Sequence, residues 1–247
     1  MPQQPVPIAI LPLGAHEQHG PHLPFETDAL IAQEVAGRLR DTASASIKPE
    51  LLPVEPVGYS IEHMDVSGTR TLRFDEAINR WIEIAGSCAA RGVRCLMLLN
   101  AHGGNSPLLT IVATEARVRF NMLVVATSWT RFGVPAEIIP PEDKAFDIHA
   151  GDIETSVMLA IRPDLVRLDA LQDFPSRQAD YARRFTHLRA YGPHAFGWKM
   201  SDLNPQGAAG NASQASAEKG EAILAHAVKG LSQLLTDMAG FDVDELK

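Results

Sequence analysis

The 247-residue chain has only two cysteines, Cys88 and Cys95, seven positions apart. Two cysteines at this spacing provide neither a disulfide framework nor a four-thiolate zinc site. We expect both to be buried, reduced thiols, Cys88 at a helix end and Cys95 in the following strand. This expectation points to a reducing, cytoplasmic location.

Basic charge is also scarce, because 22 Lys and Arg stand against 30 Asp and Glu, for a net charge of −8. The basic residues form no cluster, so nucleic acid is not an expected partner. No run approaches the roughly 18 apolar residues that cross a membrane. The first residues lack a basic start and are interrupted by prolines, so we expect neither a membrane span nor a signal peptide.

The composition that remains, with 45% hydrophobic and 21% charged residues, is typical of an ordinary globular protein. No charge block, internal repeat or low-complexity linker divides the chain. We therefore expect a single domain over residues 1–247.

Short apolar runs alternate with segments whose apolar residues recur every three or four positions. The runs predict strands at Val6–Leu13, Leu51–Val57, Val93–Leu99 and Met122–Thr127. The periodic segments predict helices at Asp28–Leu39, at Phe74–Ala90, from Asn105 or Ser106 to Arg119, at Asp152–Ile161 and at Gln214–Met238. Thr27, Asn105 or Ser106, and Asp152 are the expected helix caps. The alternation predicts one α/β domain with a largely parallel sheet and a site at the carboxyl ends of its strands.

Five of the nine histidines lie in polar loops: His16, His19, His22, His102 and His149. In the first loop, Glu17 and His19 share a face if the chain is extended, and Asp28 can fold back toward them. This combination is typical of a divalent-metal site. The alternative for each residue alone is a surface carboxylate, a loop imidazole or an acid favoured by the helix dipole.

Two further loops add chemistry. His102 follows the most buried-looking strand, and Gly103 and Gly104 permit close backbone approach before a helix start. An ordinary tight turn is the alternative. The third loop adds His149 and Glu154. The alternative role of Glu154 is a favourable interaction with the helix dipole.

These motifs together resemble the creatininase (creatinine amidohydrolase) family. The motifs are E-Q-H-G-P-H-L-P-x-x-T-D from 17 to 28, G-Y-S-x-E-H from 58 to 63, N-A-H-G-G-N from 100 to 105, H-A-G-D-x-E-T-S from 149 to 156, and A-S-A-E-K-G from 215 to 220. The resemblance implies a three-layer α/β/α sandwich with a mostly parallel central sheet. It also implies a two-metal hydrolytic site and a homohexamer.

By matching positions, the resemblance implies one metal held by Glu17, Asp28 and His102, and a second held by His19 and the bridging Asp28. The family's namesake carries a Tyr and a metal-binding Glu where this chain has Gly103 and Gly104. We expect Glu154 to supply the missing oxygen. The same departure argues against creatinine itself as the substrate.

We therefore predict a binuclear metal-dependent hydrolase of a non-peptide or cyclic amide C–N bond, with a metal-bridged hydroxide as nucleophile. Zn²⁺ is the expected cation, with Mn²⁺ or Fe²⁺ as alternatives in one position. His149 is the expected proton-transfer group, because imidazole titrates near neutrality. The expected substrate-binding residues are Ser60, Glu62, His63, Gly103 and Gly104.

A small amide or lactam is the expected substrate. A formamide deformylase and an enzyme that trims a precursor peptide are alternatives with related chemistry. A noncatalytic, metal-dependent binding protein of the same fold is a third alternative, and retention of His149 favours an enzyme.

Overall fold

The centre of the computed structural model, which describes residues 7–44 and 46–246, is a four-stranded parallel sheet. Its strands are β1 (Ile8–Leu13), β2 (Glu50–Leu51), β3 (Cys95–Asn100) and β4 (Leu123–Ser128), in the order β2-β1-β3-β4. All residues of β1 and β3 are buried. Parallel strands covered on both faces show such continuous burial.

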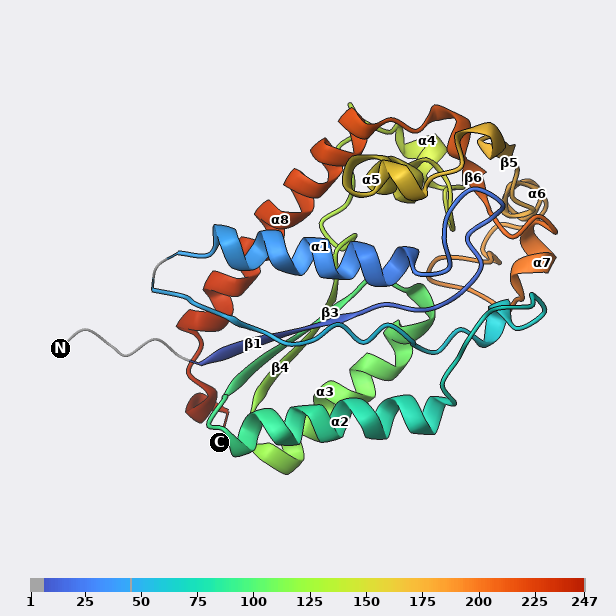
Figure 1. Cartoon of the computed structure of the whole chain (residues 1–247). Helices are drawn as coiled ribbons and strands as arrows, with labels where there is room; N and C mark the ends of the chain where they lie inside the picture. Colours follow the sequence, from blue (N-terminus) through green and yellow to red (C-terminus); the bar gives the residue numbers. More distant parts are fainter. Residues whose placement is uncertain (1–6, 45, 247) are drawn as a thin grey trace.

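Helices cover both faces of the sheet (Figure 1). One layer contains α1 (Thr27–Thr42), α5 (Asp152–Ile161) and α8 (Ala217–Gly240), and the other contains α2 (Phe74–Ala90) and α3 (Ser106–Phe120). Alternate strand residues serve the two cores: Met97 packs in the first and Leu98 in the second. The expected three-layer α/β/α sandwich is confirmed.

Shorter elements complete the described chain. The helices are α4 (Pro141–Lys144), α6 (Gln178–Arg184) and α7 (Met200–Leu203), and β5 (Asp173–Phe174) pairs with β6 (Gly210–Asn211) in an antiparallel ribbon. The 3-10 turns are η1 (Ile61–His63), η2 (Gly103–Asn105), η3 (Pro163–Leu165), η4 (Leu168–Ala170), η5 (Ala212–Gln214) and η6 (Val243–Glu245).

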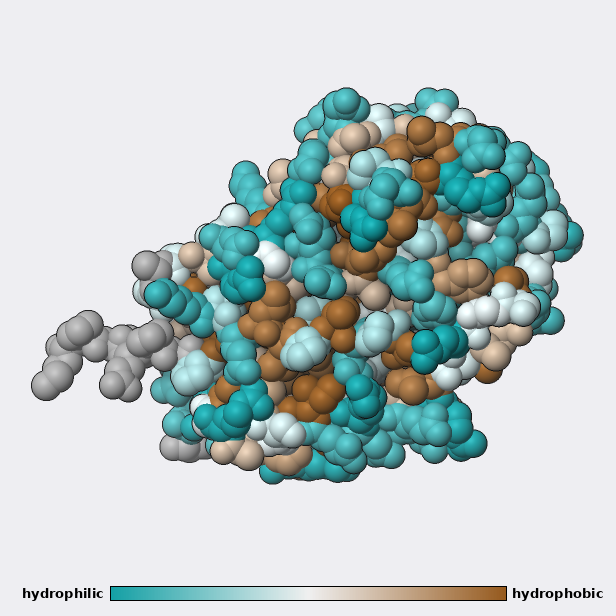
Figure 2. Space-filling view, in the orientation of Figure 1, coloured by the Kyte–Doolittle hydropathy of each residue, from teal (hydrophilic) through white to brown (hydrophobic). Residues whose placement is uncertain are grey.

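The expected strand at Leu51–Val57 is wrong in its bounds. Only Glu50 and Leu51 form a strand, followed by an isolated bridge from Leu13 to Glu55. Pro53 and Pro56 lack the N–H that a continuous ladder needs. Figure 2 shows that apolar side chains gather beside this segment, between α1 and α2. The sheet thus ends in a short, irregular edge strand.

The expected helix ranges at α2 and α5 are confirmed to the residue. Among the expected caps, Asn105 is confirmed in position, whereas Thr27 and Asp152 are wrong. Thr27 is the first residue of α1, and its hydroxyl donates to the Pro24 carbonyl at 2.7 Å. Asn105 occupies the cap position of α3 without a capping hydrogen bond. Asp152 is the first residue of α5, and Asp147 Oδ2 accepts the Ile153 N–H at 3.1 Å instead.

Other expected bounds need smaller adjustments. The last helix begins at Ala217 rather than Gln214, because Ser216 caps it and residues 212–214 form a 3-10 turn. The first strand begins at Ile8, and Val6 lies outside the described residues.

Both cysteines are buried free thiols, as expected, with Cys88 in α2 and Cys95 in β3. Burial raises the pKa of each thiol. Within the described part of the chain, none of the helices combines the length and apolar character needed to cross a bilayer.

Candidate active site

The predicted site residues come from loops that follow β1 and β3, from the segment around η1, from the loop before α5 that carries His149, and from the first turns of two helices. Glu17 and His19 follow β1, Ser60 to His63 lie in and before η1, and His102 follows β3. Asp28 and Glu154 lie in the first turns of α1 and α5. Parallel strands place their carboxyl ends at one edge, so these distant segments meet there.

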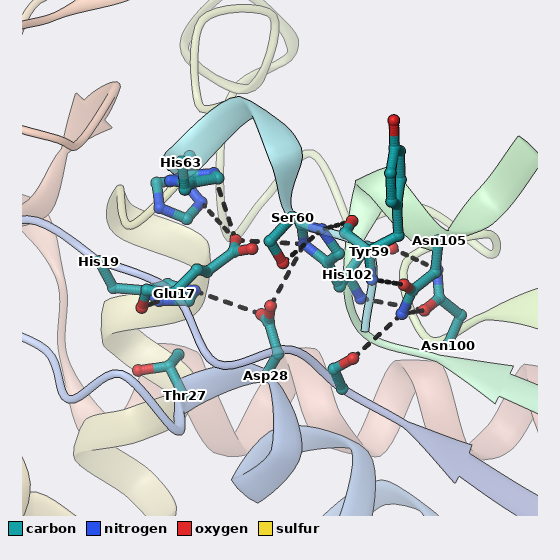
Figure 3. Close-up of polar contacts among 12 residues, drawn as sticks. Glu17, His19, Thr27, Asp28, Tyr59, Ser60, His63, Asn100, His102 and Asn105 are labelled. Carbon is teal, nitrogen blue, oxygen red and sulfur yellow. Dashed lines mark hydrogen bonds and ion pairs between the residues drawn. The ribbon is translucent and has the colours of Figure 1, made fainter. Parts of the chain in front are cut away.

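Asp28 lies between two histidines (Figure 3). Its Oδ1 is 3.3 Å from His19 Nε2, and its Oδ2 is 3.4 Å from His102 Nδ1. The Asp28 side chain is 2% exposed, so water cannot replace these neighbours. A carboxylate that divides its oxygens between two imidazoles has the arrangement required of a bridging ligand.

Backbone carbonyls assign the proton on each imidazole. His19 Nδ1 lies 3.0 Å from the Glu17 carbonyl, and His102 Nε2 lies 2.9 Å from the Tyr59 carbonyl. A carbonyl only accepts, so these nitrogens donate. In the neutral rings, the other nitrogens then present lone pairs to Asp28. Such an outer hydrogen bond is the usual way in which proteins orient a metal-binding histidine.

Glu17 is fully buried beside the same centre. Its Oε1 lies 3.1 Å from His102 Nδ1 and 3.3 Å from His63 Nε2. Despite this proximity, within residues 7–44 and 46–246 no hydrogen-bond partner is found for Glu17 Oε1 and Oε2 or for Asp28 Oδ2. Buried carboxylate oxygens are costly unless a protonated imidazole or a metal cation satisfies them. Oxygen and imidazole donors fit Zn²⁺ or Mn²⁺.

Glu154 is brought to the other side of Asp28. One ligand atom each from His19, Asp28 and Glu154 lie within 4.8 Å of one another, a spacing that fits a metal ion. Glu154 Oε2 accepts the Ala150 N–H at 2.6 Å. Ala150 has φ 51°, a left-handed conformation that costs a non-glycine residue about 1–3 kcal/mol. The residue that donates to the Glu154 carboxylate is therefore itself in a strained backbone conformation.

The pKa values reflect the close packing of charge. Burial opposes charge on His19, but Asp28 outweighs burial and raises the pKa of His19 to about 9. The pKa of His102 is also raised, because Glu17 and Asp28 prevail over burial. The pKa of Asp28 falls well below its usual range despite burial, because both histidines favour the carboxylate. Cations that bind here must displace these protons.

His149 lies beside the proposed ligands. Its Nε2 donates to the Gln18 carbonyl at 2.6 Å, and its Nδ1 is 3.8 Å from Glu17 Oε1. Its ring centroid is 4.3 Å from that of His19 and 4.5 Å from that of His63. Burial and the neighbouring His19 lower the pKa of His149 to about 4. At neutral pH the ring is therefore uncharged, and its Nδ1 carries no proton.

The expected substrate-binding residues surround His102. Ser60 Oγ lies 3.3 Å and Glu62 Oε1 lies 3.4 Å from His102 Nε2. Gly103 is exposed, and a Cβ there would meet nothing within 4 Å. A Cβ on Gly104 would instead lie 2.5 Å from His102 Nε2 and 2.6 Å from Glu62 Oε1. The Glu62 carboxylate therefore fills the space beside Gly104.

Sequence reasoning missed the role of two asparagines. Asn100 Nδ2 donates to the His102 carbonyl at 2.5 Å, and Asn100 Oδ1 accepts the His102 N–H at 3.2 Å. Asn105 accepts the Tyr59 N–H at 2.9 Å and donates to the Gly14 carbonyl at 3.0 Å. Both belong to the N-A-H-G-G-N motif. The two asparagines flank the buried His102 in this motif. That position was the sequence signal that they join loops instead of capping a helix.

Comparisons with known proteins find relatives that cover most of the chain. The creatininase family model, described as creatinine amidohydrolase, matches residues 2–235. A mycofactocin precursor peptide peptidase from Mycolicibacterium smegmatis is 33% identical over 227 residues, which cover 91% of this chain and 83% of the relative. A creatinine amidohydrolase from Pseudomonas putida is 29% identical over 247 residues, with coverage of 93% and 89%.

A solved structure of a creatininase variant, described as a Zn-Zn type, superposes with a TM-score of 0.77 at 27% identity, covering 95% of this chain and 91% of that one. The parallel sheet, the buried ligand-type side chains and the hydrolase relatives define a metal-dependent amidohydrolase. More specifically, the chain belongs to the creatininase family.

Proposed function

We propose that this chain is a binuclear metal-dependent hydrolase that cleaves the C–N bond of a small or cyclic amide. The observation that carries the proposal is the division of the two Asp28 oxygens between His19 and His102. A single-metal site has no need for a buried carboxylate shared in this way. The unpartnered oxygens of Glu17 and Asp28 add support.

The proposed ligands fall into two sets around Asp28. Glu17, Asp28 and His102 would hold one cation, and His19, Asp28 and Glu154 would hold the other. Zn²⁺ suits both sets, and Mn²⁺ or Fe²⁺ suits the more oxygen-rich of them. When bound, two such cations make a water molecule more acidic and polarise an amide carbonyl.

His149 would move the proton. Its Nδ1 faces Glu17 and carries no hydrogen in the neutral ring, because Nε2 donates to Gln18. It can therefore accept a proton as the nucleophile attacks, and return it to the leaving nitrogen as the C–N bond breaks. This role also favours an enzyme over a noncatalytic binding protein of the same fold.

The residues around His102 would orient the substrate. Ser60 and Glu62 lie on the Nε2 side of His102, and His63 contacts Glu17. Gly103 leaves open space beside the loop, whereas Glu62 fills the space beside Gly104. A hydroxyl, a carboxylate and backbone amides suit a substrate with both hydrogen-bond donors and acceptors, such as a lactam, a formamide or a small amide.

Cleavage of a modified precursor peptide is a second candidate. The observation in its favour is the 33% identity over 91% of the chain to a named precursor peptide peptidase. The open space beside Gly103 is compatible with a longer substrate. We also propose a single domain in a homo-oligomer, a hexamer by family resemblance, in a reducing cytoplasm.

The decisive experiment incubates metal-loaded protein with lactams, formamides, small amides and short peptides, and follows product masses. We expect cleavage of an amide C–N bond in one class, abolished by a chelator and by Asp28→Asn. Cleavage confined to peptides would select the second candidate. Ligand binding without product from any class would favour a binding protein.

A further inference from the structure

The A-S-A-E-K-G motif at 215–220 has no part in the proposed chemistry, yet it lies against the start of α5. It forms the beginning of α8, which packs along α5 (Figure 1). Ser216 caps α8, because its Oγ accepts the Lys219 N–H at 3.3 Å. The cap fixes the backbone from which the Lys219 side chain extends.

Lys219 closes a polar ring between the two helices. Its Nζ donates to Asp152 Oδ2 at 2.6 Å and to the Gln214 carbonyl at 2.7 Å. The other oxygen of Asp152 accepts the Ser156 hydroxyl at 2.9 Å, and Ser156 Oγ accepts the Ser216 N–H at 3.1 Å. Asp152 is buried, so its ion pair with Lys219 is screened less than a surface pair.

Gly220 explains why the ring can form. A Cβ at this position would lie 2.0 Å from the Ser156 carbonyl oxygen. The backbones of α5 and α8 therefore touch at this point, and only glycine fits there. The Ser, Lys and Gly of the motif thus all serve one contact, with the first two turns of α5.

That first turn carries Glu154. Asp152 is the first residue of α5, and Glu154 follows two positions later. The Glu154 ligand atom lies within 4.8 Å of those of His19 and Asp28. Metal ligands must be held within about 0.5 Å of a productive position. Asp147, Asp152 and Glu154 bring three carboxyl groups around this turn, and the Lys219 ammonium pairs with that of Asp152.

We propose that Lys219 is a positioning residue, which acts through Asp152 to hold Glu154 at the cation shared with His19 and Asp28. This inference rests on the proposed binuclear site. Lys219 itself does not touch that site; it fixes the helix turn from which one ligand extends.

The test is a Co²⁺ titration followed by visible absorption and calorimetry, with the unfolding temperature of each metal-free protein as a second readout. The variants are Lys219→Met, Lys219→Arg and the control Lys229→Met, which removes an exposed lysine from the same helix. We expect the original protein and Lys229→Met to bind two ions. Lys219→Met should bind the first normally and the second at least about 10-fold more weakly, with recovery in Lys219→Arg.

Equal affinity for both ions in folded Lys219→Met and in the original protein would overturn the inference. Equal weakening of both ions would also overturn it, because it would indicate general structural damage. Should Lys219→Met fail to fold, Ser156→Ala breaks the same ring without removing a charge and is scored by the same titration. Fewer than two ions in the original protein would instead refute the binuclear site itself.

Discussion

Asp28 is the residue on which both proposed cations depend. Asp28→Asn retains the shape of the side chain but removes its charge, so we expect weaker binding of both ions. His19→Ala should mainly empty the position shared with Glu154, because His102 and Glu17 remain intact. Elemental analysis after gentle desalting would measure this difference.

The contrast between these two variants is the critical result. His194→Ala, at an exposed loop histidine, is a matched control and should keep the full metal content. Full retention of both ions in both site variants would contradict the ligand assignment.

His149 should affect turnover rather than metal content. His149→Asn removes the proposed proton acceptor, and we expect turnover to fall by on the order of 10²–10⁴, the usual contribution of a positioned acid or base. Metal content should stay near that of the original protein, since Glu17 and His102 lie together without it. Single-turnover kinetics with parallel metal analysis would measure both quantities. Loss of one ion would instead make His149 a ligand.

The residue types at these positions could be read from the sequence, whereas the arrangement of their side chains could not. Glu17 and His19 were expected to share a face because strand residues alternate. His19 contacts Asp28 directly, whereas Glu17 is linked to Asp28 through His102. The tautomers of His19 and His102 depend on carbonyls of Glu17 and Tyr59. Every residue has a backbone carbonyl, so the sequence does not show which carbonyl accepts from a given histidine. No motif could therefore specify which imidazole nitrogen is free.

The bounds of a helix or strand could be predicted where the local sequence pattern alone determines them. The range of α2 followed from its apolar periodicity, which one buried face imposes. The cap expected at Asp152 was wrong because a tertiary contact with Lys219 competes for its side chain. Asn105 stands at the cap position of α3, but its side chain binds Tyr59 and Gly14 instead of the helix start. The short β2 is a second case in which a local pattern was insufficient. The apolar run predicted a longer strand, but its prolines interrupt the hydrogen-bond ladder.

The turn η2 carries a prediction at the scale of an element. A Cβ on Gly104 would collide with the Tyr59 carbonyl and with His102, whereas a Cβ on Gly103 would enter open space. We expect Gly104→Ala to shift η2 against η1, lower the unfolding temperature and weaken the cation held by His102. Gly103→Ala is the matched control and should alter neither property.

Thermal unfolding and Co²⁺ titration of the two variants would measure this difference. Because Gly104 is a proposed substrate-binding residue, turnover of Gly104→Ala should fall together with metal affinity. Tolerance of both alanines to the same degree would show that the loops around His102 adjust freely, contrary to their hydrogen bonds through Asn100 and Asn105.

At the scale of the whole molecule, the site joins both layers of the sandwich. Asp28 and Glu154 come from helices on one face of the sheet, whereas the loop that holds His102 leads into α3 on the other. Cations that bind all three segments therefore restrain the two layers together. Stability of the fold and occupancy of the site should be coupled for this reason.

Metal removal should accordingly destabilise the entire protein. A ligand that binds only the folded state adds about 2.7 kcal/mol per site at a free concentration 100 times its dissociation constant. We expect chelation to lower the free energy of unfolding by at least that amount, measured by urea titration with and without EDTA. In Asp28→Asn the difference should shrink, because binding is weaker and the metal-free state no longer buries the Asp28 charge. An unfolding free energy unchanged by chelation in the original protein would contradict tight binding at the junction of the two layers.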